Sequence, residues 1–136
     1  MIVLRNPTLV SSVADPDIRS LAKQRFAEIC AGEPYDYDQH GYMIVVEPGD
    51  RVEALEKETS CPILRNLFDD IGFGNPEFSP SFEALEEHDG CFEMVFILND
   101  NGFGIDIFIP KQQGIDPELL SMCQTYAVPA PTLTQP

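Results

Sequence analysis

Basic residues are scarce in this sequence. Eight Lys and Arg stand against 23 Asp and Glu among 136 residues, which gives a formal net charge of −15 at pH 7. Beyond Arg65, Lys111 alone opposes twelve acidic residues. A field of this sign repels nucleic acid and anionic membrane surfaces. We therefore expect no direct nucleic-acid or membrane partner, and either a basic partner protein or a charge that only keeps the chain soluble.

Long hydrophobic runs and paired cysteines are also missing. No segment is long enough to span a membrane, and the N-terminal apolar run MIVL is too short for a signal peptide. The four cysteines form no C-x-x-C pair, which predicts reduced thiols in a cytoplasmic protein; they are Cys30, Cys61, Cys91 and Cys123. The length predicts one domain over residues 1–127 that needs no disulfide, followed by a flexible Pro-rich tail over residues 128–136.

The clearest local signal is a β-hairpin over residues 91–110. Two apolar runs flank Asn101-Gly102, which can adopt the positive φ angles of a tight turn. A two-residue turn pairs Phe96 with Ile107, and a four-residue loop over residues 99–102 shifts these partners. Both place the same side chains on one face; they are Phe92, Met94, Phe96, Leu98, Ile105, Ile107 and Ile109.

The opposite face of the hairpin is mixed. It carries Glu93 and Asp106 beside three apolar side chains, Val95, Ile97 and Phe108. A wholly polar face would indicate a sheet with one side in water, whereas this mixture indicates partial cover. The two acids are then either solvated edge positions that discourage edge-to-edge pairing or the rim of a groove.

The predicted fold class is α+β. An antiparallel sheet of three or more strands is expected from residues 42–47, 91–98 and 103–110, with about four helices packed mainly against one face. Hydrophobic periodicity, capping residues and prolines place the helical segments and a short first strand. The strand is expected at residues 2–4 and the helical segments at 15–30, 50–58, 62–70, 80–90 and 116–126. The basic residues of the first helix, Arg19, Lys23 and Arg25, predict either a solvated face or an anion-attracting patch.

Cys61 is the candidate nucleophile. It precedes Pro62 at an expected helix start, where backbone N–H groups and the helix dipole stabilise a thiolate, and Arg65 lies one turn on. The alternative is a capping or half-buried thiol. A base, His40 or His88, could approach only through the fold.

Metal binding and acid–base catalysis have no clear signal. The two histidines and four cysteines lack the tight ligand pairs of a zinc site. Carboxylate pairs are too common here for any one of them to indicate catalysis. We therefore predict no metal and no cofactor.

Aromatic and acidic residues in expected loops and on the expected helix at 80–90 suggest a protein-binding surface. The alternative for the aromatic residues is a satellite core under a folded-back loop. The acids could mimic DNA only if they converged on one face. The residues predicted to bind a partner are Tyr35, Tyr37, Phe73, Phe78, Glu83, Glu86, Glu87 and Glu93.

Two segments carry a resemblance. EPYDYDQHGYMIVVEPGD (residues 33–50) and CPILRNLFDDIGFGNPEFSPSFEALEEHDGCFEMVFILNDNGFGIDIFIPK (residues 61–111) resemble small, acidic, uncharacterised proteins encoded on bacterial integrative and conjugative elements. The resemblance covers more than half of the chain but contains no motif with an assigned role. It implies a bacterial cytoplasmic accessory of mobile-element maintenance or defence evasion, and no catalytic residue.

The function predicted first is a non-enzymatic interaction protein that binds a basic partner protein, such as a DNA-handling protein of a mobile element. The alternatives are a small thiol-dependent enzyme using Cys61, and a small-ligand-binding module on the side of the sheet that carries Val95, Ile97 and Phe108. The sequence indicates no oligomeric state.

Overall fold

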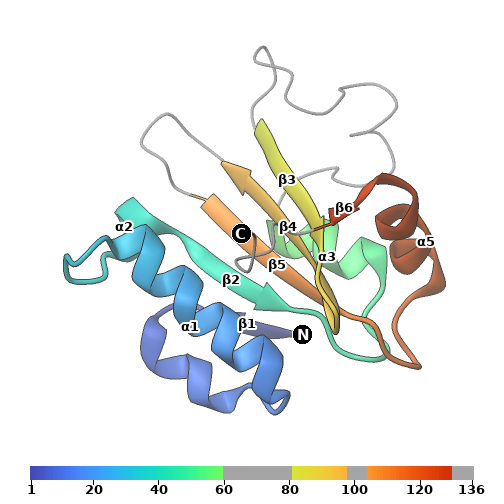
Figure 1. Ribbon diagram of the computed structural model, residues 1–136, viewed down its shortest axis with the longest axis horizontal. Coiled ribbons are helices and arrows are strands. Elements are labelled where there is room, and N and C mark those ends of the chain that lie inside the picture. Colours follow the sequence, from blue (N-terminus) through green and yellow to red (C-terminus); the bar gives the residue numbers. More distant parts are fainter. Residues whose placement is uncertain (60–80, 98–103, 130–136) are drawn as a thin grey trace, which may run out of the picture.

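The computed structural model describes residues 1–59, 81–97 and 104–129, and a mixed six-stranded sheet runs through them (Figure 1). Its strand order is β1-β2-β5-β4-β3-β6. The strands are β1 (Ile2–Leu4), β2 (Tyr42–Val45), β3 (Ser81–Glu87), β4 (Cys91–Ile97), β5 (Gly104–Pro110) and β6 (Val128–Pro129). The helices are the 3-10 turn η1 (Pro7–Ser12), α1 (Pro16–Cys30), α2 (Tyr37–His40), α3 (Val52–Thr59) and α5 (Pro117–Tyr126). The predicted α+β class is confirmed.

The predicted hairpin is present as the antiparallel pair β4–β5. Met94 lies opposite Ile107 and Phe96 opposite Ile105, which is the register of a four-residue loop rather than a two-residue turn. The loop itself lies outside the described residues. The described side chains of the apolar face are buried as predicted, and Met94 and Ile107 are both inaccessible to solvent. The side chains of Phe96 and Leu98 lie outside the description.

The expected antiparallel placement of the second strand is wrong. Strand β2 runs parallel to β5, with Tyr42 opposite Ile105 and Val45 opposite Phe108. A parallel pair needs a long crossover, and the chain between β2 and β5 supplies one through α3, β3 and β4. Every residue of β2 is buried, as expected for a strand whose sheet is covered on both faces.

The expected helix over residues 80–90 is also wrong. Residues Ser81–Glu87 form strand β3, which pairs antiparallel with β4 and places Leu85 opposite Met94. The sequence FEALEE favours a helix through its intrinsic propensities, but these are weak compared with tertiary context. Pairing along the whole of β4 and burial of Leu85 at 1% exposure outweigh them.

Helix α1 begins and ends where the sequence predicts. The side chain of Asp15 accepts hydrogen bonds from the backbone N–H groups of Asp17 and Ile18, and Pro16 occupies the first turn. At the other end, Ala31 and then Gly32 adopt positive φ angles of 50° and 85°, which stop the helix.

The helices cover both faces of the sheet rather than mainly one. Helix α1 packs on one face through Ile18, Ala22 and Phe26, which share a cluster with Phe108. Helices α3 and α5 pack on the other face through Leu55 and Leu119. The side of β5 that carries Phe108 is therefore closed by α1 (Figure 1).

The structure describes some of the remaining predicted elements but not all of them. The helices expected at 50–58 and 116–126 are present as α3 and α5, and the strand at 2–4 is β1. The first residues of the expected tail, Val128–Pro129, pair with Glu86–Glu87 of β3. The helix expected at 62–70 and the loop after it lie outside the described residues. None of the described helices combines the length and apolar character that a membrane span requires.

Candidate functional site: a buried ion-pair network beneath a surface groove

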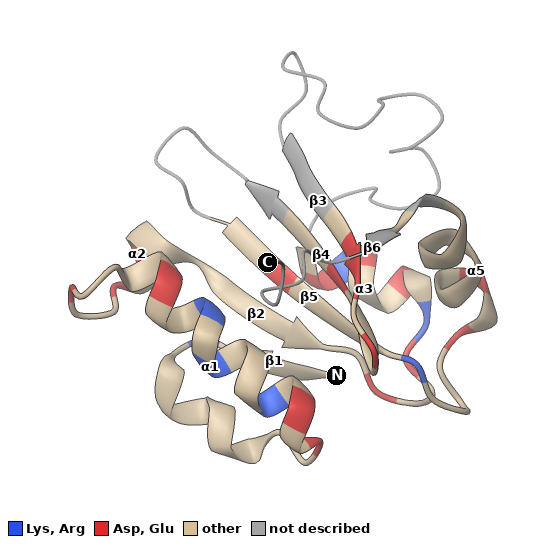
Figure 2. Cartoon of the chain, viewed as in Figure 1, with Lys and Arg blue, Asp and Glu red and all other residues tan. Residues whose placement is uncertain are grey.

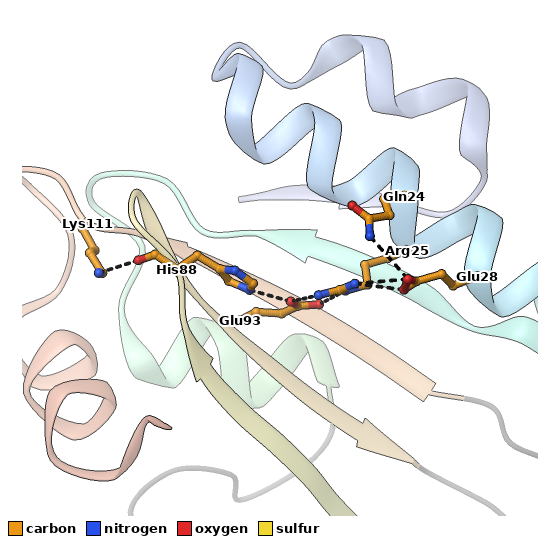
Figure 3. Close-up of polar contacts among 6 residues, drawn as sticks. All are labelled: Gln24, Arg25, Glu28, His88, Glu93 and Lys111. Atoms are coloured by element: carbon orange, nitrogen blue, oxygen red, sulfur yellow. Dashed lines mark hydrogen bonds and ion pairs between the residues drawn. The ribbon is translucent and has the colours of Figure 1, made fainter. Parts of the chain in front are cut away.

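A buried carboxylate joins α1 to the sheet (Figure 3). Glu93 alternates with Phe92 and Met94 along β4, so its side chain points to the face that α1 covers, and it is 1% exposed. Arg25 on α1 binds it with two parallel hydrogen bonds, Nε to Oε2 at 2.7 Å and Nη2 to Oε1 at 2.9 Å. Burial alone would raise the pKa of Glu93, but hydrogen bonds, led by the one from Arg25, lower it to about 2.

Two further titratable groups meet Glu93. The Nε2 atom of His88 lies 2.8 Å from Glu93 Oε1, and the imidazole remains 20% exposed. The carboxyl group of Asp106 on β5 is hydrogen-bonded to Glu93, and burial beside that carboxylate raises the pKa of Asp106 well above its usual value. This shift favours the neutral form of Asp106, which can donate a hydrogen bond to the charged Glu93.

The expectation of solvated acids on this face is wrong. Strands β4 and β5 are central in the sheet, so neither presents an edge to water. Helix α1 then covers Glu93. Because it is buried and paired, Glu93 cannot belong to an exposed recognition surface.

The network reaches the surface at two ends. Arg25 Nη1 donates to Glu28 Oε1 at 2.9 Å, within α1. On the other side, Lys111 Nζ donates to the backbone oxygen of His88 at 2.5 Å and to Glu87 Oε2 at 2.8 Å. Arg19 also points inward, because its Nη1 donates to the backbone oxygen of Val13. Of the three cations on α1, Arg25 is therefore neutralised by carboxylates, while Arg19 keeps its charge and is held by a carbonyl oxygen.

A groove of about 410 Å³ lies beside the network, between the N-terminal half of α1 and the β3–β4 turn. Its exposed carboxylates are Asp17 and Asp89, and His88 connects it to Glu93. No Lys or Arg lines the groove among the residues that the structure describes. The lining residues are Asp17, Ile18, Ser20, Leu21, Gln24, His88, Asp89, Gly90 and Cys91.

The two predicted aromatic binding residues that are described pack against the domain. The ring of Tyr35 meets Phe26 edge-on at 5.6 Å between centroids, and its hydroxyl donates to the backbone oxygen of Gly41. Tyr37 stacks on Tyr42 at 5.9 Å. Both are half-buried, which favours the satellite-core interpretation for this pair. Phe73 and Phe78 lie outside the described residues.

The predicted acidic binding residues do not form one surface. Glu86 is half-buried opposite Glu93, Glu87 is exposed and paired with Lys111, and Glu83 lies on β3. Figure 2 shows the acidic residues of the described chain on α1, on the loop between α1 and α2, on the β3–β4 hairpin and around α3 and α5. Charge is therefore distributed over several elements, and the groove is one of the places where acidic groups line a concave surface.

The described cysteines do not suit nucleophilic catalysis. Burial raises the pKa of Cys91 to about 12, and it does the same for Cys123. Cys30 is half-buried at the last turn of α1. Cys61 and Arg65, the predicted catalytic pair, lie outside the described residues.

We did not predict from the sequence that Arg25, His88 and Asp106 form one network around Glu93. The available signal was two acids, Glu93 and Asp106, on one face of an apolar strand pair, which calls for a cationic partner.

Comparisons with protein-family models, with curated proteins and with solved structures find no match for this chain. Function is therefore inferred from the geometry of these residues.

Proposed function

We propose that this chain is a non-enzymatic interaction protein that binds a basic partner protein through the groove between α1 and the β3–β4 turn. One observation supports this proposal above others. The groove combines two exposed carboxylates, Asp17 and Asp89, with apolar side chains, and the described residues that line it include no Lys or Arg. A concave acidic surface of this kind suits a Lys or Arg side chain from a partner.

The lining fits both parts of such a side chain. The apolar stem of an entering Lys or Arg can lie against Leu21 and Ile18, while its charged head reaches the carboxylates at the rim. A volume of about 410 Å³ leaves room for the side chain and for bridging water.

The walls of the groove are held in place before a partner arrives. Helix α1 forms one wall, and the hydrogen bonds between Arg25 and Glu93 fix it to β4. The opposite wall follows β3, and the backbone N–H of His88 donates to the oxygen of Cys91 at 2.8 Å across the turn. A preorganised site loses less entropy on binding.

The net charge of −15 supports the same class of partner. It accelerates the encounter with a basic protein and opposes the encounter with nucleic acid. The resemblance to proteins of integrative and conjugative elements makes a DNA-handling protein of such an element, in the bacterial cytoplasm, the candidate partner.

The experiment measures the binding of a fluorescently labelled nona-arginine peptide by anisotropy at low salt. Two double variants each remove two exposed carboxylates: Asp17→Asn with Asp89→Asn in the groove, and Glu33→Gln with Asp38→Asn away from it. We expect the groove variant to weaken binding by about tenfold or more, equivalent to about 1.4 kcal/mol, and the control variant by less than about twofold.

Two results would contradict the proposal. Equal weakening by the two double variants would indicate attraction by net charge alone. Binding that does not weaken as salt rises would exclude an electrostatic contact.

A further inference from the structure

We propose that Glu86, His88 and Glu93 form a binding site for one divalent transition-metal ion, such as Zn²⁺. Their potential ligand atoms, one from each residue, all lie within 4.8 Å of one another. Imidazole nitrogen and carboxylate oxygen are both zinc ligands, and three protein ligands leave a coordination position for water. The inference is independent of the proposed partner, because it needs no peptide in the groove.

The three residues converge because of strand pairing, not because of their spacing in the sequence. Glu86 on β3 lies directly opposite Glu93 on β4. His88 follows β3 and is held at both backbone groups, since its N–H donates to Cys91 and its oxygen accepts from Lys111. Ligands on such constrained elements are preorganised for an ion.

The contact between His88 and Glu93 indicates where the ion would lie. The distance from His88 Nε2 to Glu93 Oε1 is 2.8 Å, so the two atoms would move apart by about 0.5 Å to reach the ~3.3 Å between neighbouring ligands of a tetrahedral ion with bonds of about 2.0–2.1 Å. The ion would take the place of the proton between these two atoms, and the ring would bind as the neutral tautomer that carries its proton on Nδ1. Arg25 Nε would keep its bond to Glu93 Oε2 and orient the carboxylate, while Arg25 Nη2, which donates to Oε1 at 2.9 Å, would share that oxygen with the ion.

A second observation, independent of these ligand distances, comes from Asp106. Its Oδ1 atom is buried without a hydrogen-bond partner, which is seen for no other buried side-chain nitrogen or oxygen in the described part of the chain. Its carboxyl group also contacts Glu93. A buried polar oxygen next to the ligand carboxylate is thus left unsatisfied.

Charge balance and access also suit a divalent ion. Two cations, Arg25 and Lys111, lie near the site. The carboxylates that belong to the site or pair with these cations number four: Glu28, Glu86, Glu87 and Glu93. His88 opens onto the groove of about 410 Å³, which gives the ion a path from solvent.

The test titrates the whole chain, stripped with EDTA, with Zn²⁺ by calorimetry and with Co²⁺ by visible absorption. We expect one ion per chain, and a loss of affinity of at least about tenfold in Glu86→Gln and in His88→Gln. The matched controls are Glu87→Gln, the neighbouring carboxylate that pairs with Lys111, and His40→Gln, the other histidine. Both should bind Zn²⁺ within about twofold of the parent.

Circular dichroism of each variant establishes that the fold is retained. Absence of uptake at about 0.1 mM Zn²⁺ would overturn the site. So would unchanged affinity in Glu86→Gln, or a loss in His40→Gln equal to that in His88→Gln. A negative titration leaves the proposed partner binding intact, because the peptide assay contains no metal.

Discussion

Asp116, at the start of α5, accepts a hydrogen bond from the backbone N–H of Val52, in the first turn of α3, at 3.0 Å. The residues are separated by 64 positions in the sequence. The other carboxylate oxygen of Asp116 accepts from the N–H of Glu118 at 3.0 Å. One buried side chain therefore caps two helices, and it connects the C-terminal helix to the N-terminal half of the chain.

Replacement of this shared cap should destabilise the domain more than replacement of an ordinary one. We expect Asp116→Ala to lower the free energy of unfolding by about 2–3 kcal/mol, because two helix N-termini each lose a cap worth about 1 kcal/mol and a buried N–H is left unpaired. The control is Asp15→Ala, which removes a cap from α1 alone and should cost about 1 kcal/mol. Urea denaturation measures both, and equal losses would contradict the double role.

Removing only one partner of the ion pair between Arg25 and Glu93 should strongly lower the free energy of unfolding. In Arg25→Met, Glu93 remains buried without its main partner, and we expect a loss of about 3–5 kcal/mol in the free energy of unfolding. Arg25→Met combined with Glu93→Gln should recover part of that loss, because the stranded charge is gone. Urea denaturation at pH 7 compares these two variants with Glu93→Gln alone, and additive losses would show that the two side chains do not interact.

Gly41 should tolerate no side chain. Its φ angle is 84°, and a Cβ at this position would overlap the backbone of Gly104 at the start of β5. Gly32 provides the comparison, because its φ angle is 85° but a Cβ there would meet open space. We expect Gly32→Ala to cost about 1 kcal/mol from backbone strain alone, and Gly41→Ala to cost clearly more. Thermal unfolding compares them, and similar melting temperatures would contradict the close approach.

Stability at alkaline pH should fall as Tyr35 ionises. Burial, followed by the neighbouring Tyr37, raises the pKa of Tyr35 to about 12. The unfolded chain loses this proton near pH 10 and the folded chain near pH 12, so the contribution is complete below pH 10 and is lost as pH rises through 12. The urea midpoint should therefore decline across this range, and less steeply in Tyr35→Phe. Identical declines in the two proteins would assign the effect to other groups.

Local rules were sufficient where one segment carries its own signals. Asp15 and Pro16 determine where α1 begins, and alternation across residues 91–110 determines which side chains of the hairpin are buried. They were insufficient for residues 81–87, where helix-forming residues make a strand because β4 offers a pairing edge. The same applies to β2, whose apolar sequence is compatible with parallel or antiparallel pairing.

The candidate sites depend on contacts that no local pattern encodes. Glu93 on β4 and Arg25 on α1 are 68 residues apart, and their contact requires α1 to pack on the face of the sheet that bears Glu93. Glu86, His88 and Glu93 converge only once residues 81–87 pair with β4.

The order of amino acids by itself determined the acidity of this chain, the limits of α1 and the buried face of the hairpin, because each follows from composition or from neighbours a few residues apart. Tertiary packing alone decided that Glu93, on the other hairpin face, became a buried partner of Arg25 and His88. The physical reason is that a charged carboxylate leaves water at low cost only when a cation meets it, and strand order and helix placement bring Arg25 there from a distant segment.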